Sequence, residues 1–383
     1  MLHTTRPYVH WSVLLLLAAA LPVAAPKDRW PQFRGVPELT GLSQSTLTPP
    51  LRRLWVRSYG IDTAGRANQK GGFRSSAALI GTRGYIGSDA GYVLCFDLNT
   101  GDARWRFPTE ENWPVSATPL VINDTVYVGD EGGVFYAIDA ARGIEKWRFR
   151  TDAQIVSSAN VWQQYVLFGS YDNHVYCLDR SSGQLIWKFE TGSYVHATPA
   201  IAEHYVFAAG CDALLHVIDI RTGQQVREVD IEAQTGSSPA VVGPRLYLGN
   251  MDDAVLAVDW KAGRRLWTYR ALRRRQPFYA SPAVTESVVL IGSRDRRLHA
   301  IDRRSGSALW TFRTGGRVDS SPVVAGDVVY FGSHDGTLYA VDIRSGKRLW
   351  QYPCGGRLSA SPAIVLDRLV IGTEDGRLYC FGP

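Results

Sequence analysis

The sequence is poor in sulfur, with five cysteines and two methionines among its 383 residues. The cysteines form neither a CxxC pair nor any other spacing typical of metal ligands, which disfavours both a zinc site and a disulfide framework. Cys95, Cys177 and Cys380 fall at equivalent places in a repeat described below, so we expect them to be small buried apolar residues. The other two are Cys211 and Cys354.

Long apolar segments are also scarce. One runs from Val13 to Ala25, after Arg6 and before Pro26 and Lys27. It is short for a membrane span and is typical of an export signal. We therefore predict a signal peptide or N-terminal anchor over residues 1–25, an exported protein located in the periplasm or outside the cell, and membrane association through the N-terminus only. No cysteine ends the run, so a lipid-anchored start is not indicated.

The charge pattern identifies no nucleic-acid partner. The net charge is +6, and arginines between residues 264 and 275 contribute much of it. A basic run can face an anionic surface, but the sequence has no nucleic-acid-binding motif and no basic helix, which favours a solvated loop. We predict no nucleic-acid binding. The loop Ala271–Pro277 within this run remains a candidate for contact with a protein partner.

Helical spacing is missing as well, and a repeat of about forty residues takes its place. The clearest copy runs from Ser320 to Tyr352, where apolar residues alternate with a period of two and predict strands. An aspartate ends one strand, and a glycine and a tryptophan follow it. The aspartates are Asp97, Asp139, Asp179, Asp219, Asp259, Asp302 and Asp342. The tryptophans are Trp105, Trp147, Trp187, Trp267, Trp310 and Trp350, with Arg227 in the fourth repeat.

The turn after each aspartate explains the motif. The Asp342 carboxylate can accept hydrogen bonds from the backbone N–H groups just ahead of it, and Gly346 can adopt the positive φ that reverses the chain. A four-stranded sheet cannot bury its own faces, so we expect each indole to pack against the next sheet and to lose roughly 150–250 Å² of exposed surface. Short strands at this period predict an all-β, eight-bladed propeller of four-stranded antiparallel blades.

The last repeat is incomplete. It supplies three strands, at Ser361–Ile364, Leu369–Gly372 and Leu378–Phe381, and lacks the strand that bears tryptophan. The segment Leu51–Arg57 carries Trp55 and matches that missing strand, so we predict that an N-terminal strand closes the ring. The expected organisation is an extended leader over 26–46 and a single propeller over 47–383, with the closing strand at 47–57 and the repeats at 75–383.

A Ser or Thr marks the start of the first strand in every blade. Small side chains suit the region where inner strands converge on the axis, and we favour packing over catalysis because no His or Asp keeps a triad-like relation to them. The eight are Ser76, Thr118, Ser158, Thr198, Ser238, Ser281, Ser321 and Ser361.

The pattern Ala-x-Asp-x-x-Ser/Thr-Gly-x-x-x-Trp, best copied from Ala340 to Trp350, resembles the repeat of the pyrroloquinoline-quinone (PQQ) enzymes and their relatives. The resemblance covers residues 75–383 and the strand at 51–57, and the start Trp30-Pro31-Gln32-Phe33-Arg34-Gly35 resembles exported bacterial proteins of this class. One branch of these relatives, the quinoprotein alcohol dehydrogenases, uses PQQ and calcium beside two adjacent cysteines. The other is similar to the propeller lipoprotein of the outer-membrane β-barrel assembly machinery, a scaffold that binds partners.

This sequence departs from the dehydrogenase branch, since it has no Cys-Cys pair and no matching Glu, Asn and Asp set for calcium. We predict no cofactor and no metal site, and PQQ with calcium is the alternative. The prediction is an exported, non-enzymatic scaffold that binds a protein or peptide in the cell envelope; the alternative is a PQQ-dependent oxidoreductase. A sugar-processing enzyme would need paired carboxylates at the channel mouth, and Glu110, Glu111 and Asp319 are scattered.

Blade loops are the expected place for function, because they escape the packing constraint on the repeat. The irregular side chains just before the inner strands mix aromatic rings with cations, which suits a peptide or an anionic small molecule. Filling of the loops or the channel is the simpler interpretation, and His196 alone makes no metal site. The candidates are Arg74, Trp113, Tyr194, His196, Tyr279, Arg317, Asp319 and Arg357. The divergent fourth repeat is a binding edge or, as we favour, a drifted copy.

Overall fold

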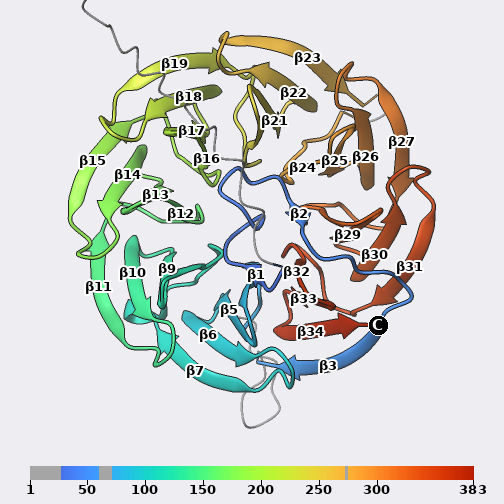
Figure 1. Cartoon of the computed structure of the whole chain (residues 1–383), viewed down its shortest axis with the longest axis horizontal. Helices are drawn as coiled ribbons and strands as arrows, with labels where there is room; N and C mark the ends of the chain where they lie inside the picture. The colour runs from blue at the N-terminus through green and yellow to red at the C-terminus, as the bar shows by residue number, and fades with distance from the viewer. Residues whose placement is uncertain (1–26, 60–70, 272–274) are drawn as a thin grey trace, which may run out of the picture.

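The computed structural model describes residues 27–59, 71–271 and 275–383. These residues form a ring of eight β-sheet blades, around which the chain passes once (Figure 1). Within them the only helix is the 3₁₀ turn η1 (Glu110–Asn112), and no helix is long and apolar enough to cross a membrane. The predicted all-β, eight-bladed propeller is confirmed. The predicted signal or anchor over 1–25 lies outside the described residues.

Blades 1 to 4 follow one another along the chain, each with its strands in order from the axis outward. They are β4 (Ala78–Ile80), β5 (Arg83–Ser88), β6 (Tyr92–Asp97) and β7 (Ala103–Pro108); β8 (Leu120–Ile122), β9 (Thr125–Gly129), β10 (Val134–Asp139) and β11 (Glu145–Arg150); β12 (Asn160–Trp162), β13 (Tyr165–Gly169), β14 (His174–Asp179) and β15 (Leu185–Glu190); and β16 (Ala200–Ala202), β17 (Tyr205–Ala209), β18 (Leu214–Asp219) and β19 (Gln225–Asp230).

Blades 5 to 8 complete the ring in the same way. Their strands are β20 (Ala240–Val242), β21 (Arg245–Gly249), β22 (Ala254–Asp259) and β23 (Arg264–Arg270); β24 (Ala283–Val284), β25 (Val288–Ser293), β26 (Arg297–Asp302) and β27 (Ala308–Arg313); β28 (Val323–Ala325), β29 (Val328–Gly332), β30 (Thr337–Asp342) and β31 (Arg348–Pro353); and β32 (Ala363–Val365), β33 (Arg368–Gly372), β34 (Arg377–Gly382) and β3 (Arg52–Ser58).

The eighth blade takes its outer strand from the front of the chain. β3 pairs antiparallel with β34, with Trp55 opposite Cys380 and Arg57 opposite Leu378. The Trp55 indole is buried and donates a hydrogen bond of 2.9 Å to the carbonyl of Leu98 in blade 1. The predicted closure of the ring by an N-terminal strand is therefore confirmed, and the same tryptophan links the eighth blade to the first.

Five of the other repeat tryptophans link blades in the same manner. The indole of Trp105 donates to the Ala140 carbonyl at 3.1 Å, that of Trp187 to Ile220 at 2.7 Å, and the bonds of Trp147, Trp267 and Trp310 follow the pattern. Each acceptor is the residue that follows the repeat aspartate in the next blade. These indoles are half-buried, unlike Trp55, so they lose less surface than complete burial would remove.

The repeat glycine has a role in this contact beyond its turn. Gly306 has a φ of +75°, and a Cβ added there would lie 2.7 Å from the ring of Trp267 in the preceding blade. Gly143 and Gly346 stand in the same relation to Trp105 and Trp310. The glycine therefore leaves the space that the neighbouring indole occupies.

The fourth blade replaces its tryptophan with Arg227, and a different indole fills the gap. Trp260, the residue after the repeat aspartate of blade 5, is buried against Phe207 and Tyr205 of blade 4, with ring centroids 5.0 and 5.3 Å away. Its Nε1 donates to the carbonyl of Gly243 at 2.9 Å. An aromatic contact therefore joins blades 4 and 5 from the opposite direction, which fits a drifted repeat.

The leader crosses one end of the ring axis (Figure 1). Its backbone carbonyls accept hydrogen bonds of 2.7–3.2 Å from the inner strands, or the turns that follow them, in seven blades; the donors are Gly81, Val121, Ile201, Val241, Val284, Val324 and Leu366. Blade 3 contributes the side chain of Asn160, which donates to Pro37 O at 2.8 Å. Short strands β1 (Arg29–Trp30) and β2 (Leu42–Ser43) pair with β4 and β28. We call this side of the ring the leader face.

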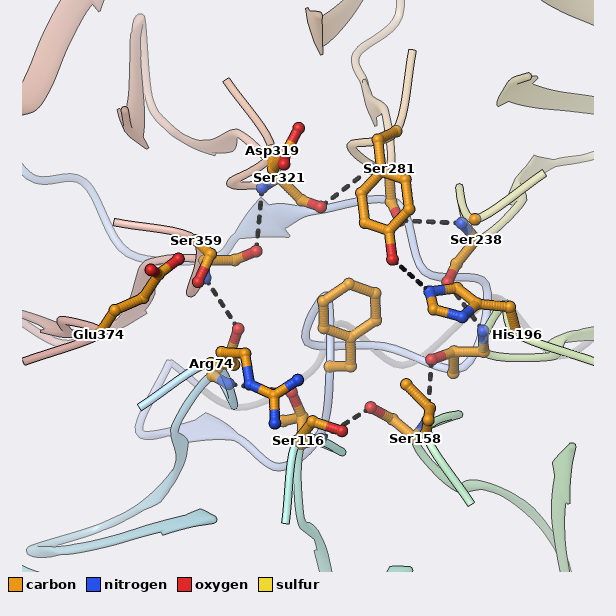
Figure 2. A pocket seen from close by; sticks show the side chains of 18 of the residues that line it. Arg74, Ser116, Ser158, His196, Ser238, Ser281, Asp319, Ser321, Ser359 and Glu374 are labelled. Atoms are coloured by element: carbon orange, nitrogen blue, oxygen red, sulfur yellow. Dashed lines mark hydrogen bonds between the residues drawn. The ribbon is translucent and has the colours of Figure 1, made fainter. Parts of the chain in front are cut away.

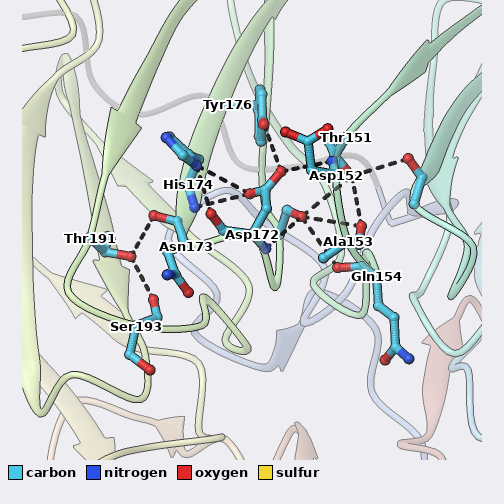
Figure 3. A network of polar contacts seen from close by, with 12 residues as sticks. Thr151, Asp152, Ala153, Gln154, Asp172, Asn173, His174, Tyr176, Thr191 and Ser193 are labelled. Atoms are coloured by element: carbon cyan, nitrogen blue, oxygen red, sulfur yellow. Dashed lines mark hydrogen bonds and ion pairs between the residues drawn. The ribbon is translucent and has the colours of Figure 1, made fainter.

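The opposite side, here called the mouth face, is held by polar networks that the repeat analysis did not detect. Figure 3 shows the one in blade 3. Asp172 Oδ2 accepts hydrogen bonds from the Tyr176 hydroxyl at 2.7 Å and from the backbone N–H of Asp152, at the end of blade 2, at 3.1 Å. Asp335 makes the matching pair of contacts in blade 7, with Tyr339 and Gly315.

The cysteines act as the sequence predicted. All five are unpaired, and Cys95, Cys177 and Cys380 are buried within β6, β14 and β34. Burial raises the pKa of the Cys95 thiol to about 11 and that of the Cys177 thiol to about 12. These thiols stay protonated at neutral pH, as small apolar core residues should.

Candidate functional site

Eight hydroxyls form a closed ring around the axis. The inner strands start about two residues after Ser76, Thr118 and their counterparts, because the backbone at these residues bonds to the neighbouring blade instead of to its own. The Ser238 N–H donates to Ser281 Oγ, the Ser281 N–H to Ser321 Oγ, and so on round the ring until the Ser361 N–H donates to Ser76 Oγ. All eight bonds measure 2.9–3.2 Å (Figure 2).

This hydroxyl ring lines a cavity of about 390 Å³ on the axis. Phe33 of the leader also lines it, on the leader side, and the mouth face supplies charged and aromatic side chains. The cavity lies near the lower end of the size range of small-molecule sites, about 300–1,000 Å³. Most of its lining residues are polar or charged, with the side chains of Phe33 and Val156 the apolar exceptions, so it suits a polar ligand.

Two arginine–carboxylate networks stand at the mouth. Arg74 pairs with Asp89 at 2.8 Å and Glu131 at 2.9 Å. On the other side Asp319 is shared by Arg294, at 3.0 Å, and Arg317, at 3.1 Å. The Asp319 side chain is 7% exposed, whereas that of Arg317 is 47% exposed. Each of these arginines is therefore held at the mouth by carboxylates that are less exposed than its own side chain.

A histidine between two tyrosines makes a third group. The hydroxyls of Tyr171 and Tyr279 lie 2.5 Å from His196 Nδ1 and Nε2 respectively. Burial, and secondly the charge of Arg294, lower the pKa of His196 to about 4. The imidazole is therefore neutral at physiological pH, so one nitrogen donates to one tyrosine and the other accepts from the second. Arg294 also lies over the Tyr279 ring, 4.5 Å from its centroid.

His334 completes the mouth on the side of blades 7 and 8. Arg317 Nε donates to its Nδ1 at 3.2 Å. Because a guanidinium only donates, Nδ1 must accept and Nε2 must carry the proton of the neutral ring. Burial lowers the pKa of His334, which favours that neutral form. Its Nε2 lies 3.7 Å from Asp319 Oδ2 and 3.9 Å from Glu374 Oε1, beyond hydrogen-bond distance, and has no partner among the described residues.

The structure brings together five of the eight residues singled out in the sequence. Arg74, His196, Tyr279, Arg317 and Asp319 all line the cavity.

The other three lie on the mouth face outside the cavity. Trp113 is 43% exposed and packs beside Gly132; Tyr194 is 51% exposed and stacks on Tyr171 with centroids 5.0 Å apart. Arg357 is exposed, and its carbonyl accepts a hydrogen bond from the N–H of Glu374.

Several cavity residues escaped the sequence analysis. Tyr171, Arg294, His334 and Glu374 all follow the second strand of a blade, a loop that also reaches the mouth. The sequence could have indicated them, because the loop after the second strand lies at the same end of the blade as the loop before the inner strand. Glu374, rather than Glu110, comes close to Asp319, since these two carboxylates lie 3.9 and 3.7 Å from His334 Nε2. Glu110 lies in η1 and pairs with Arg150.

Asp89 makes stability depend on pH. Burial raises its pKa from 3.8 to about 6, against the opposing effect of Arg74. The folded protein therefore takes up this proton at a higher pH than the unfolded chain does, and acidification from pH 6 to pH 4 favours folding. We expect the melting temperature of the wild type, relative to Asp89→Asn, to rise as pH falls through 6 and to level off near 4. A difference that stays constant, or that shrinks on acidification, would contradict this assignment.

The described residues offer no group of three or more His, Cys, Asp or Glu side chains that could hold a metal ion. Asp89, Glu131 and Asp319 are paired with arginines instead, and the sequence has no adjacent cysteines. These residues do not fit PQQ held with calcium as the resemblance would require.

Comparison with known proteins identifies the family. The family model described as outer membrane protein assembly factor BamB matches residues 47–171, 171–282 and 271–383, which together span the closing strand and all the repeats. The chain belongs to this BamB family. The predicted resemblance to PQQ-like propellers is confirmed. No curated protein was found to match the chain.

Solved structures share the fold of this BamB-family propeller at low identity. BamB from Moraxella catarrhalis has a TM-score of 0.72 and 18% identity, covering 87% of this chain and 100% of that one. The quinohemoprotein alcohol dehydrogenase of Comamonas testosteroni has a TM-score of 0.80 and 14% identity, covering 94% and 81%. The computationally designed Ika8 protein has a TM-score of 0.73 and 16% identity, covering 85% and 100%. The eight-bladed fold is thus shared by a BamB protein, a quinohemoprotein alcohol dehydrogenase and a computationally designed protein.

Proposed function

We propose that this protein is an exported, non-enzymatic scaffold of the cell envelope that binds a protein or peptide partner on its mouth face. The observation that carries the proposal is the collection of exposed Trp113, Tyr194, Arg74 and Arg317 around one cavity. Tryptophan, tyrosine and arginine are the side chains that most often dominate binding energy at protein interfaces. Membership of the BamB family supports a role in the envelope, and the apolar run before residue 26 supports export.

Rigidity supports the same role. The blades are joined by indoles, the inner strands by the hydroxyl ring, and the leader face by hydrogen bonds to all eight blades. A partner that meets side chains already held in place loses less conformational entropy on binding. The mouth networks fix Arg74 and Arg317 in this way.

The test compares two double variants in capture of partners from an envelope extract. Trp113→Ala with Tyr194→Ala removes two exposed rings from the mouth face and is expected to reduce the captured partner at least tenfold. Leu185→Ala with Leu349→Ala removes equally exposed side chains from the outer strands and should leave capture unchanged. Melting temperatures of both should match the wild type, because all four side chains are about half exposed. Equal capture by both variants would exclude the mouth face as the partner site.

A PQQ-dependent oxidoreductase is the rival proposal. A polar cavity of 390 Å³ lined by three arginines is the feature that favours it, since PQQ carries carboxylates. Two absences weigh against it: the part of the chain that the structure describes has no cluster of metal-binding side chains, and the sequence has no adjacent cysteines. After incubation with PQQ and calcium we expect no cofactor absorbance to remain with the protein and no dye-linked alcohol oxidation above the protein-free control. Turnover that depends on both additions would overturn the scaffold proposal.

A further inference from the structure

The hydroxyl ring has O–H groups that donate no hydrogen bond within the described chain. Each of its eight oxygens accepts one backbone N–H from the neighbouring blade, and none donates a hydrogen bond to another group of the described chain. A hydroxyl that accepts a hydrogen bond becomes a better donor, because the bonds polarise one another. Ser116 Oγ and Ser359 Oγ also line the cavity, and neither has any partner in the described chain. The deep part of the cavity therefore presents converging O–H donors.

The leader lies across one end of the cavity. Phe33 lines it on the leader side, where the backbone carbonyls of residues 27–41 accept hydrogen bonds from seven blades. A polypeptide cannot thread through such a cavity. A single chain end needs less width than a loop, which is two chains wide, and is therefore the simpler occupant of a cavity of about 390 Å³.

The mouth offers a different chemistry from the hydroxyl ring. Arg74 and Arg317 are 44% and 47% exposed and can donate, while Glu131 and Glu374 can accept. His334 adds an N–H donor that is about nine-tenths buried and unpartnered within the described residues. Donors and acceptors side by side match the alternating N–H and C=O groups of a peptide backbone. The two carboxylates near His334 would repel a second anion at that level but not at the hydroxyl ring.

We propose that the cavity binds the free carboxyl end of an extended peptide, with the terminal carboxylate in the hydroxyl ring and the preceding backbone along the charged mouth. The carboxylate is acceptor-only and can use the unspent O–H donors of the ring, and hydrogen bonds to a charged oxygen are stronger than those between neutral groups. This inference rests on the proposed function, since it names the part of a partner that the mouth face receives.

The test uses synthetic peptides that differ only at the last atom group. A randomised hexapeptide mixture with free carboxyl ends and the same mixture with carboxamide ends are passed over the full-length protein, and retained peptides are measured by mass spectrometry. We expect at least tenfold greater retention of the free-acid mixture. Equal retention of both mixtures, or retention of neither, would overturn this inference. Partner capture that depends on Trp113 and Tyr194 would still support the scaffold proposal in either case.

Matched serine variants tie the effect to the hydroxyl ring. Ser238→Ala with Ser321→Ala removes two hydroxyls of the ring. Ser237→Ala with Ser320→Ala removes two buried hydroxyls one residue away, which accept the N–H groups of Gly249 and Gly332 outside the cavity. Each pair leaves two buried N–H groups without acceptors, so a purely structural effect would be similar in both. We expect only the first pair to lose the preference for free carboxyl ends.

Competition by small oxyanions distinguishes a site for peptide chain ends from a general anion site. Inorganic phosphate and acetate should compete with the retained peptides only weakly, because they make no contact with the mouth. Either anion binding at the hydroxyl ring as tightly as the best free-acid peptide would show a small-oxyanion site and overturn the peptide assignment.

Discussion

Deletion of residues 47–57 is expected to lower the melting temperature by about 10 °C or more, the largest effect predicted for this protein. The segment supplies β3, which covers the outer edge of β34, and Trp55, which is 6% exposed and bonded to Leu98 of blade 1. Without it the ring has an open seam between the eighth and first blades. The single change Trp55→Ala should cost about 3–5 kcal/mol, as expected for loss of a buried tryptophan.

The matched control is Trp113→Ala, which removes the same side chain from an exposed position. With 43% of its surface exposed and no link between blades, it should change the free energy of unfolding by less than about 1 kcal/mol. Thermal unfolding followed by circular dichroism measures all three variants. If the deletion melts at the wild-type temperature, the seam is closed by something other than β3.

Gly306→Ala is expected to be nearly as damaging, at about 2–5 kcal/mol. A residue with a Cβ is strained by about 1–2 kcal/mol at a left-handed conformation such as the φ of +75° at Gly306. The added carbon would also lie 2.7 Å from the Trp267 indole, which is wedged between blades and cannot move freely. Overpacking of this kind typically costs a further 1–3 kcal/mol or so.

Alanine substitutions at two other glycines separate the backbone strain from the overpacking against the indole. Gly243 has a φ of +58° with no atom within 4 Å of an added Cβ, so Gly243→Ala measures the backbone strain alone. Gly263 has a φ of +67° and faces the flexible Arg227 at 2.8 Å, so it should fall in between. In urea unfolding we expect the loss of stability to be smallest for Gly243→Ala, larger for Gly263→Ala and largest for Gly306→Ala. Equal losses at all three would mean that the indole contact contributes nothing.

The fold was predictable because its information is local and repeated. An aspartate such as Asp342 ends a strand, accepts the N–H groups of Arg344 and Ser345, and is followed by a glycine with positive φ. Each copy carries the same short-range chemistry, so spacing alone revealed the strands. Trp55 could also be matched to its blade, because the residues that flank it resemble those that flank the other repeat tryptophans.

The candidate site was only partly predictable, because its members meet by closure of the ring. Tyr171 and Tyr279 are separated by more than two blades in sequence, yet both reach His196. No local sequence pattern in either loop predicts that the two loops meet. The hydroxyl ring was likewise visible as eight small residues, but its hydrogen bonds run between blades, and only the assembled structure shows their common direction.

The path of the leader also sets the order in which the molecule can be completed. Residues 27–41 are made early, yet their carbonyls need partners as far along the chain as Leu366. The closing strand likewise waits for β34, almost the last segment of the chain. Both must remain unsatisfied throughout synthesis, so the native ring cannot be finished blade by blade as the polypeptide emerges.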